Sequence, residues 1–173
     1  MYKIVILAFL VLSANAANLT LTGGEIKAHT EVFGDDHINP SSKSIESHVT
    51  INNTIDSMKG KISIAALSLK SDNDDRDKHM YEAINAKTDP IIAFEIQNVT
   101  KVDTGYKING VLKLNGVSKN IASLATIADV NNTLNVSGLF SINLTDFKIE
   151  PPRLLFLTVR NQIDITYNLT YKK

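Results

Sequence analysis

Hydrophobic and polar residues alternate along most of the chain after its first 16 residues, with the period of two that predicts half-buried β-strands. Short stretches rich in Gly, Asn, Asp, Pro and Ser separate the alternating runs, as turns and loops do. About eight antiparallel strands at this spacing predict an all-β fold, either a sandwich or an up-and-down barrel. The predicted strands cover residues 18–23, 25–33, 45–51, 58–70, 90–102, 105–115, 117–130, 133–144 and 154–172.

Several predicted strands have one apolar and one polar face. An eight-stranded barrel encloses just enough space for its own side chains or for one small ligand. Trp is absent, and small residues such as Ala28, Ala66 and Gly110 would leave room inside, but the pattern fits both a packed core and a cavity. If there is a cavity, we expect the hydroxyl of Tyr106 to offer a polar contact. The residues predicted to line it are Phe94, Ile96, Tyr106, Ile108, Gly110, Leu112, Leu114, Val136, Phe140 and Ile142.

The most charged window of the chain, "SDNDDRDKHMYEA" at residues 71–83, interrupts the strands. Its spacing does not fit a calcium loop, since the frames that start at residues 72 and 73 lack both the turn glycine and the final glutamate. No HExxH motif is present for zinc, so we expect no metal site. A helix explains the window better: Ser71 or Asp72 would cap it, and Met80 and Ile84 would form an apolar pair at i,i+4 spacing. We therefore predict one short helix at the rim.

An enzyme is the main alternative for this window. His79 with Asp75 or Asp77 could act as a general acid–base pair on a bound ester, amide or pyrophosphate. The chain has no G-x-S-x-G motif, and no Ser lies close to His79 in the sequence. We therefore expect no catalytic residues and no cofactor.

The first 16 residues have the features of a signal peptide: Lys3, an apolar run at 4–12, and Ala14-Asn15-Ala16 as a cleavage site. This predicts a periplasmic or secreted domain over residues 17–173. With no cysteine, the chain can have neither disulfides nor a lipid-modified cysteine, and we expect no stable membrane anchor. Removing Lys3 leaves 17 basic against 18 acidic residues, a net charge of −1, which does not favour nucleic acid as a partner. A homodimer is compatible with these patterns.

Four segments together resemble the YceI-like family of bacterial periplasmic lipid-binding proteins. Residues 71–96, "SDNDDRDKHMYEAINAKTDPIIAFEI", resemble that family's R-D-x-H-[LM] helix and Y-P-x-[IA]-x-F strand. "INGVLKLNGVSKNI" is similar to its G-x-L-x-L-N-G-V-x-K hairpin, "FSINLTDFKI" to its late Asp-Phe-Gly strand, and "NQIDITYNLTYKK" to its last strand. The chain departs from the family pattern at Asp89, often Tyr, at Leu144, often Arg, and at Lys148, often Gly.

The resemblance implies a lipocalin-like, eight-stranded antiparallel barrel whose apolar interior holds a long isoprenoid or fatty chain. It implies a binding protein without catalytic residues. On this basis we expect a long-chain amphiphile, an isoprenoid, fatty acid or fatty amide, to be sequestered or transported. A barrel filled by its own side chains, with a role in envelope stress or protein interaction, is the other non-enzymatic hypothesis.

Overall fold

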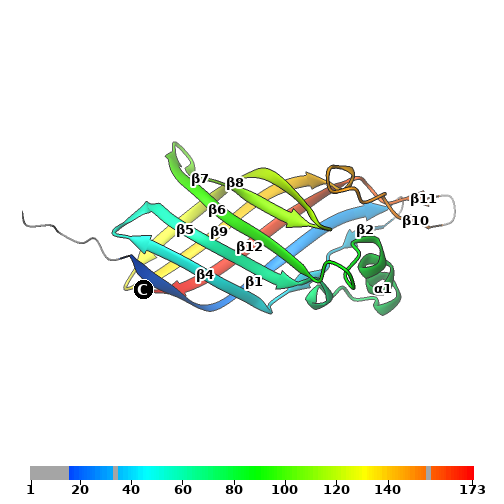
Figure 1. Ribbon diagram of the computed structural model, residues 1–173, viewed down its shortest axis with the longest axis horizontal. Coiled ribbons are helices and arrows are strands. Elements are labelled where there is room, and N and C mark those ends of the chain that lie inside the picture. The colour runs from blue at the N-terminus through cyan, green and yellow to red at the C-terminus, as the bar shows by residue number, and fades with distance from the viewer. Residues whose placement is uncertain (1–15, 33–34, 155–156) are drawn as a thin grey trace, which may run out of the picture.

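The protein is a closed eight-stranded antiparallel barrel with one short helix at its rim (Figure 1). The structure is a computed structural model that describes residues 16–32, 35–154 and 157–173. The predicted signal peptide therefore lies outside the described residues, apart from Ala16. The all-β barrel predicted from the sequence is confirmed. Its wall consists of β1 (Ala17–Val32), β4 (Ile45–Asn52), β5 (Thr54–Ala65), β6 (Ile91–Val102), β7 (Gly105–Leu114), β8 (Val117–Val130), β9 (Thr133–Asn143) and β12 (Gln162–Lys172).

Each wall strand pairs with its neighbours in the chain, and the last strand returns to the first. The β6–β7 ladder brings Phe94 opposite Leu112, and the β8–β9 ladder brings Ile127 opposite Val136. The ring closes where β12 pairs with β1, with Ile165 opposite Ala28. Because the ring has no break, the apolar faces of all eight strands point into one interior.

The remaining elements lie in the connections between wall strands. Two of them, β2 and β3, pair with β1 outside the main ring. The hairpin of β10 and β11 extends beyond one end of the barrel (Figure 1). These elements are β2 (Asp35–Ile38), β3 (Ser41–Ser42), the 3₁₀ turns η1 (Ala66–Ser68) and η2 (Leu144–Phe147), the helix α1 (Asp74–Ala83), β10 (Arg153–Leu154) and β11 (Leu157–Thr158).

Three strand predictions differ from the structure. Residues 17–32 form one strand, β1, with an irregularity between Leu21 and Gly23, rather than two strands; residue 33 of the prediction lies outside the described residues. The strand predicted for 58–70 begins earlier, at Thr54, and ends at Ala65, where the chain turns into η1. The strand predicted for 154–172 begins only at Gln162.

The two ends of the barrel differ in the length of their connections. At one end the turns are tight, and Asn53 (φ 65°), Asn131 (φ 50°) and Asn132 (φ 64°) take left-handed conformations, which Asn tolerates better than most residues. The opposite end carries the long connections, including the one with α1. Lys148, where the family often has Gly, also has a left-handed conformation (φ 57°) and ends η2.

The charged window does form the short rim helix, but Asn73 is its N-cap, not Ser71 or Asp72. The Asn73 side chain accepts hydrogen bonds from the backbone N–H groups of Asp75 and Arg76, at 3.1 and 3.0 Å. Asp77 is buried, with 1% of its surface exposed, and accepts hydrogen bonds from the backbone N–H and hydroxyl of Ser71. Ser71 therefore holds the start of the helix through Asp77 rather than by capping it.

Two apolar clusters form the core, one towards each end of the barrel. The cluster at the tight-turn end contains Met58, Leu134 and Tyr171. The cluster at the α1 end contains Ile84, Leu114 and Phe147 and seats the helix on the barrel. The space between these clusters is the feature that bears on function.

Candidate ligand-binding cavity

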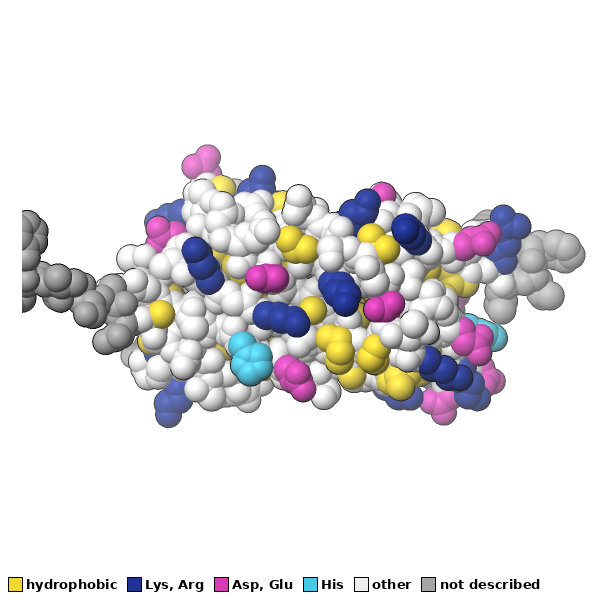
Figure 2. Space-filling model, viewed as in Figure 1, with side chains coloured by type: hydrophobic (Ala, Val, Ile, Leu, Met, Phe, Trp, Pro, Cys, Tyr) yellow, Lys and Arg dark blue, Asp and Glu magenta, His cyan; other side chains and the backbone are white. Residues whose placement is uncertain are grey.

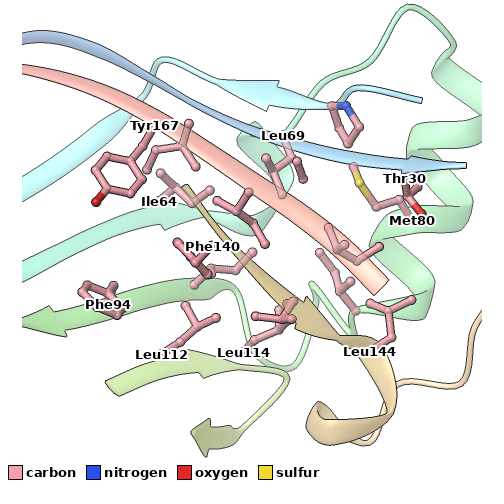
Figure 3. A pocket seen from close by; sticks show the side chains of 18 of the residues that line it. Thr30, Ile64, Leu69, Met80, Phe94, Leu112, Leu114, Phe140, Leu144 and Tyr167 are labelled. Carbon is pink, nitrogen blue, oxygen red and sulfur yellow. The ribbon is translucent and has the colours of Figure 1, made fainter. Parts of the chain in front are cut away.

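A cavity of about 950 Å³ occupies the barrel interior and reaches the α1 end. This volume lies at the upper end of the range typical of small-molecule sites, roughly 300–1,000 Å³. Figure 3 shows Met80 and Thr30 close to α1, and Phe94 and Tyr167 at the opposite side of the view, with aliphatic side chains between them. The cavity is therefore elongated and mainly apolar, as a long hydrocarbon chain requires.

Eight of the ten residues predicted to contact a ligand line this cavity. The alternation along β6, β7 and β9 points every second side chain inward, and these side chains meet across the barrel. Phe94 and Phe140 lie with ring centroids 6.2 Å apart, so the two aromatic residues form a single surface. That these residues bind a ligand stays a prediction. The eight are Phe94, Ile96, Ile108, Leu112, Leu114, Val136, Phe140 and Ile142.

Tyr106 and Gly110 are not among the lining residues. Tyr106 packs against the core cluster at the tight-turn end, whose members Ile108 and Tyr171 line the cavity, but Tyr106 itself does not line it. At Gly110, a Cβ atom would lie 2.3 Å from the carbonyl oxygen of Glu95 and 2.5 Å from Cζ of Phe94. The Phe94 ring thus covers Gly110, and the space that the missing side chain leaves belongs to Phe94 rather than to a ligand.

Many of the lining residues that were not predicted come from β1, β5 and β12, and others come from α1 and the connections at the same end. Ile26, Ala28 and Thr30 of β1 face the cavity, as do Ile62 and Ile64 of β5. The alternation of apolar and polar residues, which identified the other lining residues, could also have identified these. On β12, the apolar face also lines the cavity, through Ile163, Ile165, Tyr167, Leu169 and Tyr171.

Inside the barrel, the polar groups of the lining include two tyrosine hydroxyls bonded to serines. The Tyr167 hydroxyl lies 2.8 Å from Oγ of Ser123, which donates a hydrogen bond to the carbonyl oxygen of Leu139 at 3.0 Å. The Tyr171 hydroxyl lies 2.9 Å from Oγ of Ser47. Burial raises the pKa of both tyrosines above the usual value, so their hydroxyls stay neutral. These groups can offer hydrogen bonds but no charge.

Charged side chains line the cavity only beside α1, in the part of the chain that the structure describes. Arg76, Asp77 and Glu82 belong to the helix, Asp35 to β2 and Arg153 to β10. Most of them are partly or fully exposed, which shows that this end of the cavity meets solvent. It is therefore the mouth of the cavity.

The geometry does not assemble an acid–base site around His79. His79 is exposed at the mouth, and no hydrogen bond joins it to Asp75 or Asp77 in the described structure. Asp77 instead bonds Ser71 and lies 3.9 Å from Nζ of Lys70, while Asp75 pairs with Lys78 at 2.7 Å. The hydrogen-bonded relay that a catalytic histidine needs is thus not formed here. Within the described ranges, no group of three His, Asp or Glu side chains could hold a metal ion.

The outer face of the barrel in Figure 2 has positive and negative side chains interspersed among scattered apolar ones. No large patch of a single charge covers this face, in keeping with equal numbers of basic and acidic residues. Among the residues described, no helix has the length and hydropathy needed to cross a membrane.

Solved structures share this barrel at low sequence identity. BcnA of Burkholderia cenocepacia matches with a TM-score of 0.76 and 15% identity, over 85% of this chain and 95% of that protein. A Campylobacter jejuni YceI protein matches with a TM-score of 0.65 and 17% identity, over 99% and 91% of the two chains. A polyisoprenoid-binding domain from Saccharophagus degradans, implicated in plant cell wall breakdown, matches with a TM-score of 0.68 and 13% identity, over 91% and 99%. At these identities the likeness concerns the fold.

Similarity at the level of sequence comes from a family model. No curated protein matches the chain. The model of the YceI-like domain, however, matches residues 15–171, which include α1, the mouth of the cavity and all of the wall strands except Lys172 at the end of β12. The motifs at 71–96, at the β7–β8 hairpin and in β12 lie within this match, which confirms the resemblance seen in the sequence: the chain belongs to the YceI-like family.

Proposed function

We propose that the protein binds a long-chain amphiphile, an isoprenoid, a fatty acid or a fatty amide, in its barrel cavity, and so sequesters or transports it. The observation that carries this proposal is the elongated cavity of about 950 Å³, lined with aliphatic and aromatic side chains from the mouth to the tight-turn end. A barrel filled by its own side chains would leave no such space, so the cavity argues against the filled-barrel hypothesis. The match to a polyisoprenoid-binding domain in another bacterium is consistent with a ligand of this class.

The driving force for binding is the transfer of the chain from water to the apolar interior. At about 0.8 kcal/mol per buried CH₂, a chain of roughly 20 carbons gains about 16 kcal/mol before costs. Lost translational freedom and ordering of the chain remove several kcal/mol or more of this gain. The remainder is enough for tight binding without a covalent step or a cofactor.

We further propose that the domain acts in the periplasm or as a secreted protein, because residues 1–16 have the features of a signal peptide. In such a compartment, a carrier would keep an insoluble chain out of water between membranes or proteins. Mass analysis of the exported protein tests this: an intact "MYKIVIL" start would contradict it.

Extraction of the purified protein with organic solvent, followed by mass spectrometry, tests the binding proposal directly. We expect a long-chain amphiphile that co-purifies in nearly stoichiometric amount and is chemically intact. An empty protein that also fails to bind added fatty or isoprenoid ligands would refute the proposal. A ligand recovered in hydrolysed form would instead support the enzyme hypothesis around His79.

A further inference from the structure

The charges at the cavity mouth sum to a negative value. Three carboxylates line it, Asp35, Asp77 and Glu82, against two guanidinium groups, Arg76 and Arg153. Leaving His79 aside, the described lining therefore has one more carboxylate than guanidinium groups. A site that binds an anionic head group normally offers a surplus of donors and positive charge. The mouth lacks that surplus.

Arg76 is the lining cation closest to forming an anion site, but carboxylates already occupy it. Its Nη2 lies 2.8 Å from Oδ2 of Asp35, and its Nη1 lies 3.4 Å from Oδ1 of Asp72. Arg76 is held between β2 and the turn before α1, with 31% of its side chain exposed. A phosphate or carboxylate head group would have to displace Asp35 or share the guanidinium with it, and two anions on one guanidinium repel each other.

The other nearby cations do not compensate. Arg153 is exposed on β10 and has no ion pair within the described residues, so a contact to it would be screened by solvent. Lys70, which does not line the cavity, lies 3.9 Å from the buried Asp77 and 5.6 Å from the ring centroid of Tyr81. Lys70 thus lies beside Asp77 and Tyr81, which leaves the exposed Arg153 as the second cation of the described lining.

Deeper in the barrel, the polar groups also favour a ligand whose head group is uncharged. The hydroxyls of Tyr167 and Tyr171 are neutral and hydrogen-bonded to Ser123 and Ser47. An ionised head group that moved inward would lose its hydration without meeting an opposite charge. An uncharged head can stay at the mouth, where carboxylates accept hydrogen bonds from an amide or a hydroxyl group.

We propose that this cavity selects amphiphiles with an uncharged, hydrogen-bond-donating head group, an amide or an alcohol, and discriminates against phosphates and carboxylates because Asp35 and Asp72 occupy Arg76. The inference rests on the proposed lipid-binding function and names its ligand class. Asp35 and Asp72 are thus specificity-determining residues.

Matched ligands that differ only in the head group test the selection. Hexadecanamide, hexadecanol, hexadecanoate and hexadecyl phosphate would each compete with a fluorescent fatty probe for the unmodified protein, in slightly alkaline buffer where both acids are ionised. We expect the two neutral ligands to bind at least about tenfold more tightly, a difference of about 1.4 kcal/mol.

A double variant tests the role of the carboxylates. In Asp35→Asn/Asp72→Asn, Arg76 becomes available to an anion, and we expect the preference for hexadecanamide over hexadecyl phosphate to fall about tenfold. The matched control is Asp74→Asn/Asp75→Asn. It also removes two negative charges, from the first turn of α1, but neither residue pairs with Arg76 or lines the cavity. The control should keep the preference of the unmodified protein, so a change caused by net charge alone would show in both variants.

The outcomes separate the inference from the function on which it rests. If none of the four ligands binds, the lipid-binding function itself is refuted. If hexadecyl phosphate or hexadecanoate binds the unmodified protein as tightly as the amide, lipid binding stands and the selection is refuted. If the preference is present but equal in both double variants, the assignment to Asp35 and Asp72 is wrong. Circular dichroism on each variant confirms that it is folded before its preference is compared.

Discussion

Ala28 offers a direct way to narrow the cavity without disturbing the wall. It lies in the middle of β1, lines the cavity and pairs with Ile165 of β12, which lines it as well. Its small side chain leaves space in front of it, whereas Gly110 is already covered by Phe94. We predict that Ala28→Leu weakens ligand binding while the barrel keeps its stability.

The size of the effect follows from the volume that the new side chain takes. Leu adds three carbon atoms to Ala, and these would displace about three methylene groups of a bound chain. At about 0.8 kcal/mol per buried CH₂, the loss is about 2.4 kcal/mol. This corresponds to roughly a 60-fold increase in the dissociation constant.

The assay is a titration with a fluorescent fatty ligand together with thermal unfolding of the ligand-free protein. Lys27→Leu is the matched control, because Lys27 is the exposed neighbour of Ala28 on the same strand and points away from the cavity. It should leave the dissociation constant within about twofold. The expected pattern is weaker binding in Ala28→Leu only, with melting temperatures close to that of the unmodified protein.

A close-packed interior predicts the opposite result. Adding three carbons to a filled core costs about 1–3 kcal/mol of folding free energy. For a domain of this size, each kcal/mol lowers the melting temperature by about 2–4 °C. A melting temperature that falls by several degrees in ligand-free Ala28→Leu, with unchanged ligand binding, would refute the reasoning.

Two further predictions concern stability. Hydrogen bonds from Ser141 and Gln162, with Arg160 nearby, lower the pKa of Asp164 to about 2, below its unfolded value near 3.9. The ionised carboxylate therefore contributes fully to the free energy of unfolding above about pH 4, and this contribution is lost as the pH falls towards 2. Urea unfolding should show that Asp164→Asn reduces the loss of stability over that interval, and an unchanged acid slope would contradict the assignment. Ile84→Ala removes a buried side chain beside α1 and should lower the free energy of unfolding by about 2–5 kcal/mol. Because His79 is exposed, His79→Ala should change that free energy by no more than about 0.5 kcal/mol. Equal losses for the two variants in denaturant titrations would show that Ile84 does not hold α1 on the barrel.

The sequence predicted best those parts of the fold whose pairing is local. The strands β6 to β9 were located to within about one residue, because each hairpin combines period-two alternation with a recognisable turn, such as Asn115-Gly116. β1 was predicted as two strands, since Gly23 and Gly24 look like a turn. Its continuity comes from pairing with β12 at the other end of the chain, and local sequence does not carry that information.

For the site, alternation identified which side chains point inward but not how far along the strand the cavity extends. Tyr106 packs against the core cluster at the tight-turn end without lining the cavity, and the space at Gly110 is filled by Phe94 from the neighbouring strand. The charged mouth could not be foreseen either, because Asp35, Arg76 and Arg153 come from three separate connections. These three side chains come close together only because the barrel closes and brings the three connections to the same end.

The pairing of β1 with β12 has a consequence for when the cavity comes into being. The first and last wall strands must meet before the ring closes, so β12 has to leave the ribosome and dock before an enclosed interior exists. Until then the open sheet has an unpaired edge at each side and an exposed apolar face, and its final contact is among the most distant in sequence that this chain can make. Under the proposed function, a ligand that binds only the closed state would pull this last step forward by mass action. A ligand of the proposed kind would therefore be acquired after synthesis, and its concentration where the chain folds would add to the stability of the closed barrel.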